Sequence, residues 1–378
     1  GDVGAAAAAA AARPGPSVDA RTWMFRGVHP VHYEVASCPP ADGGGAGEEA
    51  DDVVPLVLLA GFGVASFHYR RLMRELLVRD GDSLAGGRLR IYALDYLGQG
   101  RSWPPGCDDG FSPAEDGLGY SADTWVEQVE DFVAEVVLDG RGGPGAGEGK
   151  GKKRRAHLLG NSVGGYLSAM LASRRPDLVE SLTLVNATPV WGLNLPGWDG
   201  RLPAPFLPRV IGRAGFDLIR NPDVIDKYLD SAYVHRAAHD GSHPDSFHPP
   251  SHPDHDGLEA GRPLASRIRE CTEGDGGHAA FASILFSPPA SDRATGGPAD
   301  FYATLRGLEA DVLLLFGEED EWCSPPVARR MHSTLAGRGD GGGDGGEGGP
   351  ATRYVSLGGC GHCPVHEAPG ATAGVVGP

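Results

Sequence analysis

The stretch that most constrains how this chain can fold is residues 158–166, which have the sequence LLGNSVGGY. A short apolar run leads into a G-x-S-x-G pattern, with Ser162 at its centre between Gly160 and Gly164. Apolar residues then recur at the spacing of a helix with one buried face. The pattern predicts a buried strand, a sharp turn that presents the serine hydroxyl, and a helix whose positive end lies beside that oxygen. A Gly-rich turn that contains a serine by chance has the same pattern, so this motif alone leaves both interpretations open.

Short apolar runs and helix-like segments alternate through most of the chain. A nearly continuous apolar run, typical of a strand covered on both faces, occurs at residues 53–59, and further strands are expected at residues 89–94, 156–159, 182–185, 312–316 and 352–357. Helical spacing follows at residues 69–77, 122–138, 163–171 and 325–335. Ser66 is expected to cap the first of these helices. The alternation predicts an α/β fold with a mostly parallel sheet and helices on both faces, entered by a β-hairpin at residues 22–36.

The alternation is lost between residues 186 and 306, and this interval divides the chain. We expect residues 21–188 and 307–378 to form the core, and residues 189–306 to form an inserted, mainly helical cap with a His/Pro-rich low-complexity insert. Helical patches of the cap are expected at residues 208–219, 222–238 and 264–271. Residues 1–20 include an alanine run and are either the remnant of a targeting segment or a disordered arm.

The charge balance restricts the partners of the chain. Lys and Arg number 33 against 50 Asp and Glu, a net charge of −17, which disfavours nucleic acid or an anionic membrane surface as the main partner. No apolar run reaches the about 18 residues that a membrane span needs. The six cysteines are scattered without a disulfide-like spacing, which favours a reducing compartment with free thiols.

Two residues after later strands complete a catalytic pattern with Ser162. Asp320 follows the predicted strand at residues 312–316, and His362 lies in a Gly-rich loop after the last predicted strand. A serine nucleophile needs a base to take its proton and a third group to orient that base. The chain order Ser, acid, His is that of α/β-hydrolases, so we predict a triad of nucleophile, acid and base. The acid is the least specified member, because Glu318, Glu319 and Glu321 are its neighbours and the alternative position after the preceding strand holds Asn186.

The negative oxygen of a tetrahedral intermediate needs donors that are already in place. We expect the backbone N–H of Val163, directly after the nucleophile, to be one donor and the N–H of Phe62 to be the other. The alternative for residues 60–63 is a plain tight turn. No metal site is expected: Cys360 and Cys363 have C-x-x-C spacing but no second pair, and the six histidines of residues 235–255 are better explained as a low-complexity loop.

Several blocks together resemble the pheophytinase family of α/β-hydrolases. They are GFGV and SFHY at residues 61–69, DYLGQG at 95–100, GNS at 160–162, LVNATP at 184–189, residues 280–287, and GHCP at 361–364. The resemblance implies an α/β-hydrolase fold, no cofactor, and hydrolysis of the phytyl ester of pheophytin in plastids, in the stroma or at the thylakoid surface. Carried over to this sequence, it makes Ser162 the nucleophile, His362 the base and Asp320 the group that orients it.

A large apolar ester needs a wide apolar site, and the aromatic cap offers candidates to line it. They are Trp191, Phe281, Ile284 and Phe286, each of which could equally be part of the cap's own core. The sequence departs from the family at Val163, where leucine is expected, and at its C-terminal end, where the family continues into a final helix. The alternatives are a chlorophyll dephytylase or lipid esterase of the same fold, and a non-catalytic protein that binds tetrapyrroles or lipids.

Overall fold

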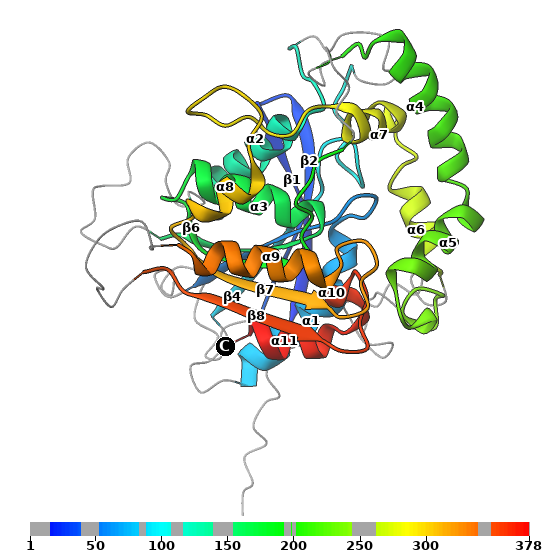
Figure 1. The fold of residues 1–378 in the computed structure, drawn as a ribbon. Coiled ribbons are helices and arrows are strands. Elements are labelled where there is room, and N and C mark those ends of the chain that lie inside the picture. Colours follow the sequence, from blue (N-terminus) through cyan, green and yellow to red (C-terminus); the bar gives the residue numbers. More distant parts are fainter. Residues whose placement is uncertain are drawn as a thin grey trace, which may run out of the picture.

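The computed structural model describes residues 16–38, 53–82, 88–106, 116–138, 154–192, 198, 202–243, 262–338 and 349–377. Eight strands of this described part form one sheet in the order β1-β2-β4-β3-β5-β6-β7-β8 (Figure 1). The strands are β1 (Ser17–Phe25), β2 (His29–Ser37), β3 (Val54–Leu59), β4 (Leu89–Leu94), β5 (Ala156–Asn161), β6 (Val179–Val185), β7 (Asp311–Gly317) and β8 (Thr352–Leu357). The pairs β1–β2 and β2–β4 are antiparallel and the others parallel, which confirms the predicted α/β-hydrolase fold.

Helices cover both faces of the sheet, and consecutive strand residues point alternately into two cores. Leu158 and Leu314 belong to the cluster formed with α2 (Ala122–Phe132), α3 (Val163–Arg174), α8 (Phe301–Arg306) and α9 (Pro325–Ala336). The next residues, Leu159 and Leu315, belong to the cluster formed with α1 (Arg70–Asp82) and α11 (Pro369–Val376). Because side chains alternate along a strand, a strand with two cores must be apolar throughout, which explains the continuous apolar runs.

Several predicted boundaries were wrong. Ser66 does not cap α1: it lies in the short 3-10 helix η2 (Ser66–Tyr69), and its N–H donates to Asp95 at 2.7 Å. The helix predicted at residues 122–138, by contrast, has the predicted bounds, as α2 (Ala122–Phe132) followed by the π-helical segment η3 (Val133–Leu138). The strand β1 begins at Ser17, so part of the predicted arm 1–20 pairs in the sheet; residues 1–15 lie outside the described residues.

The cap contains α4 (Phe206–Ile219), α5 (Pro222–Ala232), η4 (Arg236–Ala238), α6 (Leu264–Glu270) and α7 (Gly277–Phe286). Figure 1 shows α4, α5 and α6 in a column beside the sheet domain. The helix α8 falls inside the range 189–306 expected for the cap but packs on the core, where Phe301 stacks on Tyr166 of α3 at 5.6 Å. The cap helices therefore end at α7. Most of the predicted His/Pro-rich insert, residues 244–261, lies outside the described residues.

The C-terminal residues form two short helices, α10 (Pro364–Glu367) and α11, the second of which packs on α1. Within the described ranges, none of the helices has the length and apolar composition needed to cross a membrane.

Candidate active site

The serine of the G-x-S-x-G motif has a strained backbone. Ser162 lies between β5 and α3 with φ 55° and ψ −117°, a conformation that L-residues with a side chain rarely adopt. Its flanking glycines are needed for steric reasons: a Cβ at Gly160 would lie 2.2 Å from the Gly164 carbonyl oxygen, and a Cβ at Gly164 would lie 1.9 Å from that of Leu59. Strained residues of this kind persist where the surrounding structure holds them, and they cluster at functional sites.

The predicted acid and base are in direct contact. Asp320 follows β7, His362 follows β8, and both are buried. The Nδ1 atom of His362 lies 2.8 Å from Oδ2 of Asp320, and the backbone N–H of Trp322 donates to Oδ1 at 2.8 Å. Burial raises the pKa of Asp320, but the hydrogen bond with His362, the charge of that histidine and a hydrogen bond from Asn186 outweigh it, so the pKa lies below its ordinary value. The carboxylate is therefore ionised at neutral pH.

Asn186 holds the acid in position, a role that the sequence did not indicate. This residue directly follows β6 in a left-handed conformation, φ 41°, and is completely buried. Its Nδ2 donates to Asp320 Oδ2 at 2.6 Å, and its Oδ1 accepts the N–H of Gly317 at 3.0 Å. Asn186 is thus the partner of the acid rather than a substitute for it. A polar residue directly after a buried strand was the available signal.

Two further contacts position the loop that carries His362. Asn161, the residue before the serine, donates its Nδ2 to the carbonyl of His362 at 3.0 Å. The N–H of His362 donates to the carbonyl of Ala232, the last residue of the cap helix α5, at 2.7 Å. Among the hydrogen bonds of the described residues there is none between the Ser162 hydroxyl and the His362 ring, and catalytic hydrogen bonds of this kind often form only with substrate present.

The loop expected to contribute the oxyanion donor passes beside the serine. A Cβ on Gly61 would lie 3.5 Å from the Cβ of Ser162. The backbone at Phe62 is therefore next to the strand-to-helix turn that carries Ser162, which we call the elbow. The N–H of Gly63 is already used, because it donates to the side chain of Gln99 at 2.8 Å. Val163 is the first residue of α3, and the N–H groups of a first helical turn have no acceptor within the helix. The positions of Phe62 and Val163 suit the predicted role.

The four predicted substrate-lining residues differ in their surroundings. Phe281 lies against Phe62, with ring centroids 5.9 Å apart, and so reaches the loop that follows β3 and passes beside Ser162. Trp191 instead packs between Trp125 and Tyr166, at 5.4 and 5.5 Å, within the main core. Ile284 belongs to the same buried cluster, whereas Phe286 packs in a small cluster around Trp198. Of these four, Phe281 contacts the ring of Phe62 in the loop beside Ser162.

Sequence reasoning missed Trp322, which lies two residues after the acid. Its side chain is 49 % exposed, and its ring centroid lies 4.8 Å from that of His362. The indole nitrogen donates to the Ser231 hydroxyl at 3.2 Å, so the ring joins the cap to the histidine loop. Trp322 therefore presents an apolar surface beside the His362 ring.

One group of potential metal ligands lies in the described part of the chain: Asp320, Cys323 and His362, whose ligand atoms lie within 4.8 Å of one another. Burial raises the pKa of Cys323 to about 12, so in the metal-free site this thiol is protonated at neutral pH. Burial likewise raises the pKa of Cys363 to about 12, which argues against a reactive C-x-x-C pair. Histidines 248, 252 and 255 of the predicted loop lie outside the described residues.

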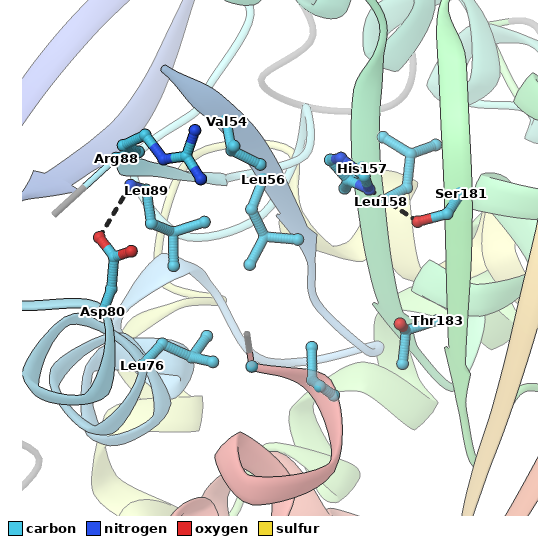
Figure 2. Close-up of a pocket in the computed structure, with 12 residues that line it drawn as sticks. Val54, Leu56, Leu76, Asp80, Arg88, Leu89, His157, Leu158, Ser181 and Thr183 are labelled. Atoms are coloured by element: carbon cyan, nitrogen blue, oxygen red, sulfur yellow. Dashed lines mark hydrogen bonds between the residues drawn. The ribbon is translucent and has the colours of Figure 1, made fainter. Parts of the chain in front are cut away.

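A separate cavity of about 290 Å³ lies at the opposite end of the sheet (Figure 2). It is lined by residues at the starts of parallel strands, among them Val54 of β3, His157 of β5 and Ser181 of β6. Ser162 follows the carboxyl end of β5, where ligands of α/β sheets bind. This cavity is therefore not the candidate active site.

A mostly parallel sheet, a serine at a strained strand-to-helix turn and an Asp–His pair after the last two strands define the class of α/β hydrolases. In agreement, the sequence profile of the Alpha/beta hydrolase family matches residues 56–375, and the chain belongs to this family.

Relatives and solved structures agree with this assignment. The chain is 28 % identical over 374 residues to chloroplastic pheophytinase of Arabidopsis thaliana, covering 90 % of this chain but 61 % of that protein. It is 29 % identical to the human (lyso)-N-acylphosphatidylethanolamine lipase, over 39 % of this chain and 33 % of the lipase. The fold is similar to that of a membrane phospholipase A that is a bacterial virulence factor, with a TM-score of 0.55, 22 % identity, and coverage of 95 % and 84 % of the two chains. It is also similar to the meta-cleavage product hydrolase of Pseudomonas fluorescens IP01, with a TM-score of 0.57, 16 % identity, and coverage of 94 % and 95 %.

Proposed function

We propose that this α/β hydrolase is a serine carboxylic-ester hydrolase that removes phytol from pheophytin to give pheophorbide. The observation that carries the proposal is the buried Asp320–His362 contact at the same end of the sheet as the strained Ser162. Similarity to a pheophytinase over 90 % of this chain supports the substrate. Since the chain spans 61 % of the length of that relative, the activity is proposed for the described site and not for a whole protein.

The chemistry would follow from the positions of these groups. Oγ of Ser162 attacks the ester carbonyl while Nε2 of His362 takes its proton, and Asp320 stabilises the imidazolium. The N–H groups of Phe62 and Val163 hold the negative oxygen of the tetrahedral intermediate. The imidazolium then protonates the phytol oxygen as that bond breaks and leaves an acyl-enzyme. Water, deprotonated by His362, attacks the acyl-enzyme and releases the carboxylic acid.

An apolar substrate fits the groups around the serine. Phe62 and Trp322 are 40 % and 49 % exposed and lie beside the elbow and the His362 ring, and Phe281 packs on the first of them. Exposed aromatic rings at a reactive serine favour a large apolar ester over a charged metabolite. We carry the plastid location of the Arabidopsis relative over to this chain as part of the same proposal, and immunoblotting of purified plastids and of their membrane fraction would test it.

The second candidate is a lipid esterase of the same fold, favoured by the 29 % identity between 39 % of this chain and the human lipase. A parallel assay separates these functions. Purified protein is presented with detergent-dispersed pheophytin, chlorophyll and a lysophospholipid, and the products are separated by chromatography. Pheophorbide as the main product supports the first proposal, whereas chlorophyllide or free fatty acid as the main product replaces it with the alternative.

Ser162→Ala tests the mechanism with any of these substrates. We expect a loss of activity of about 10³-fold or more, because the nucleophile is removed. The matched control is Ser168→Ala, which removes a buried hydroxyl six residues later that bonds only to a helix carbonyl, Gly164 at 2.7 Å. If folded Ser162→Ala releases phytol at the wild-type rate, the proposed mechanism is wrong. If wild type binds pigment but hydrolyses no ester, the chain is a binding protein.

A further inference from the structure

The outer face of the cap helix α4 is unusually apolar. Phe206, Leu207 and Leu218 are 71 %, 61 % and 67 % exposed, and Val210 and Ile211 are about half exposed. These positions recur every three, four or seven residues, so they lie along one stripe of the helix. An exposed contiguous apolar stripe is rare on a soluble protein and marks a surface that contacts another phase or another molecule.

The stripe is not the face by which α4 packs on the cap. Gly212 and Phe216 form the inner face: a Cβ on Gly212 would lie 2.8 Å from Ala282 of α7, and Phe216 contacts Phe281 with ring centroids 5.7 Å apart. Figure 1 shows α4 at the outer edge of the molecule, with the sheet domain on its other side. The apolar stripe therefore faces away from the protein.

The charges of α4 differ from those of the chain as a whole. Residues 206–220 contain Arg209, Arg213 and Arg220 against Asp217 alone, three positive charges minus one negative, in a chain with a net charge of −17. An amphipathic helix with an apolar face and arginines beside it is the pattern of helices that lie in a membrane interface. A contact between two copies of this helix fits less well, because a two-fold contact would bring the arginines of both copies together.

A continuous series of aromatic contacts connects α4 with the serine. Phe216 on the inner face of α4 contacts Phe281, and Phe281 contacts Phe62 in the loop beside Ser162. Phe216 and Phe281 are themselves buried, so these contacts are internal packing and not an exposed path. They place the inner face of α4 within two side chains of the loop beside Ser162.

We propose that α4 docks this protein on the surface of a lipid bilayer, with its apolar stripe in the interface, and that the ester substrate enters from the bilayer. The docking step stands on the stripe and its charges, and the entry of substrate rests on the proposed esterase function. The net negative charge of the remaining chain would orient the molecule, because it keeps the acidic parts away from an anionic surface while α4 faces it.

Sedimentation with vesicles tests the docking step. The full chain is mixed with vesicles of phosphatidylcholine containing three tenths phosphatidylglycerol, and the bound fraction gives a partition coefficient. Ile211→Asp or Leu207→Asp should lower it by about tenfold or more, because an apolar side chain in the interface is replaced by a charge of the same sign as the lipid. Val78→Asp on α1 is the matched control: Val78 is 48 % exposed, as is Ile211, but lies on another part of the molecule, so the coefficient should not change.

Three readouts separate docking from catalysis. Ser162→Ala should bind vesicles like wild type, and Ile211→Asp should hydrolyse a soluble short-chain ester like wild type while losing activity on substrate embedded in vesicles. If wild type does not bind the vesicles, or if Ile211→Asp and Val78→Asp bind equally well, the docking proposal is wrong. If Ile211→Asp instead converts a dimer to a monomer in analytical ultracentrifugation with no vesicle binding by wild type, the stripe is a contact between copies. Loss of soluble-ester hydrolysis in Ser162→Ala concerns only the proposed function.

Discussion

Replacing Asp320 with asparagine tests how the acid supports the base. In wild type both carboxylate oxygens only accept: Oδ1 from the N–H of Trp322, and Oδ2 from Asn186 and from His362. An asparagine has almost the same shape but offers one acceptor oxygen and one NH₂ group. In the variant, the new NH₂ group must therefore face at least one of these three donors, whichever way the amide is turned.

The two orientations have different consequences. With the amide oxygen at the Oδ2 position, His362 keeps its tautomer but loses the negative charge that stabilises its protonated form, and the N–H of Trp322 is left without an acceptor. With the NH₂ group there, Nδ1 of His362 must accept, so the proton moves to Nε2 and the ring can no longer act as a base. A rotation of Asn186 that relieves this conflict would leave the N–H of Gly317 without its acceptor.

The expected magnitude follows from these losses. Loss of the orienting carboxylate lowers kcat by up to about 10⁴-fold, equivalent to about 5 kcal/mol of transition-state stabilisation. An unsatisfied buried donor lowers the free energy of unfolding by about 1 to 3 kcal/mol. We therefore expect Asp320→Asn to fold with reduced stability and to lose at least about 100-fold in kcat on a soluble ester.

Steady-state hydrolysis of p-nitrophenyl butyrate and urea unfolding measure both effects. Glu321→Gln is the matched control, because it makes the same change of charge at the exposed neighbouring residue and should retain wild-type values. Retention of more than a tenth of kcat by folded Asp320→Asn would refute this reasoning. An equal loss in Glu321→Gln would show that the charge of the loop, rather than the acid in contact with His362, supports catalysis.

Three further predictions follow from the same contacts. Gly164→Ala should lower the free energy of unfolding by more than about 3 kcal/mol in urea titrations, because its Cβ would overlap a carbonyl oxygen at 1.9 Å, whereas Gly297→Ala, with its nearest heavy atom at 3.7 Å, should change it little. Burial raises the pKa of Asp320, but its hydrogen bonds lower the pKa by more than burial raises it, so the folded-state pKa lies below the ordinary value. Wild type should therefore keep the stability from this group above about pH 4 and lose it as the pH falls through the lowered pKa. The pH dependence of unfolding of Asp320→Asn should lack this component. Because burial raises the pKa of Cys323 to about 12 and this residue is only 5 % exposed, iodoacetamide at pH 8 should label it in the native protein at least about 100-fold more slowly than in urea, and equal rates would contradict the burial.

The sheet could be predicted well because its signal is local. The strands β3 and β7, which lie inside the sheet, consist mainly of continuous apolar runs, and the turn at Ser162 needs glycines where a Cβ would overlap backbone atoms. The acid at Asp320 could be placed after its strand, but three neighbouring glutamates have the same chemistry, and only the fold distinguishes them. Asp320 alone among these four acids has a recorded hydrogen bond with His362 in the described part of the chain.

The cap was predicted less well because its packing is decided at long range. The helix α7 has apolar residues on all sides, since it is covered by α4 and by the core, and so lacks the one-sided periodicity that marks an amphipathic helix. Trp191 was expected near the substrate because tryptophan is common in apolar sites, yet its indole N–H finds Ser287 at 3.1 Å within the core. Asn186 was missed because its two partners lie about 130 residues further along the chain.

The hydrogen bond from the N–H of His362 to the carbonyl of Ala232 ties the residue proposed as base to the cap helix α5. Two other partners of His362, Asn161 and Asp320, belong to the sheet domain. A displacement of α5 would therefore remove one of these three contacts that hold His362 and leave the other two in place. The cap thereby contributes directly to the position of the base.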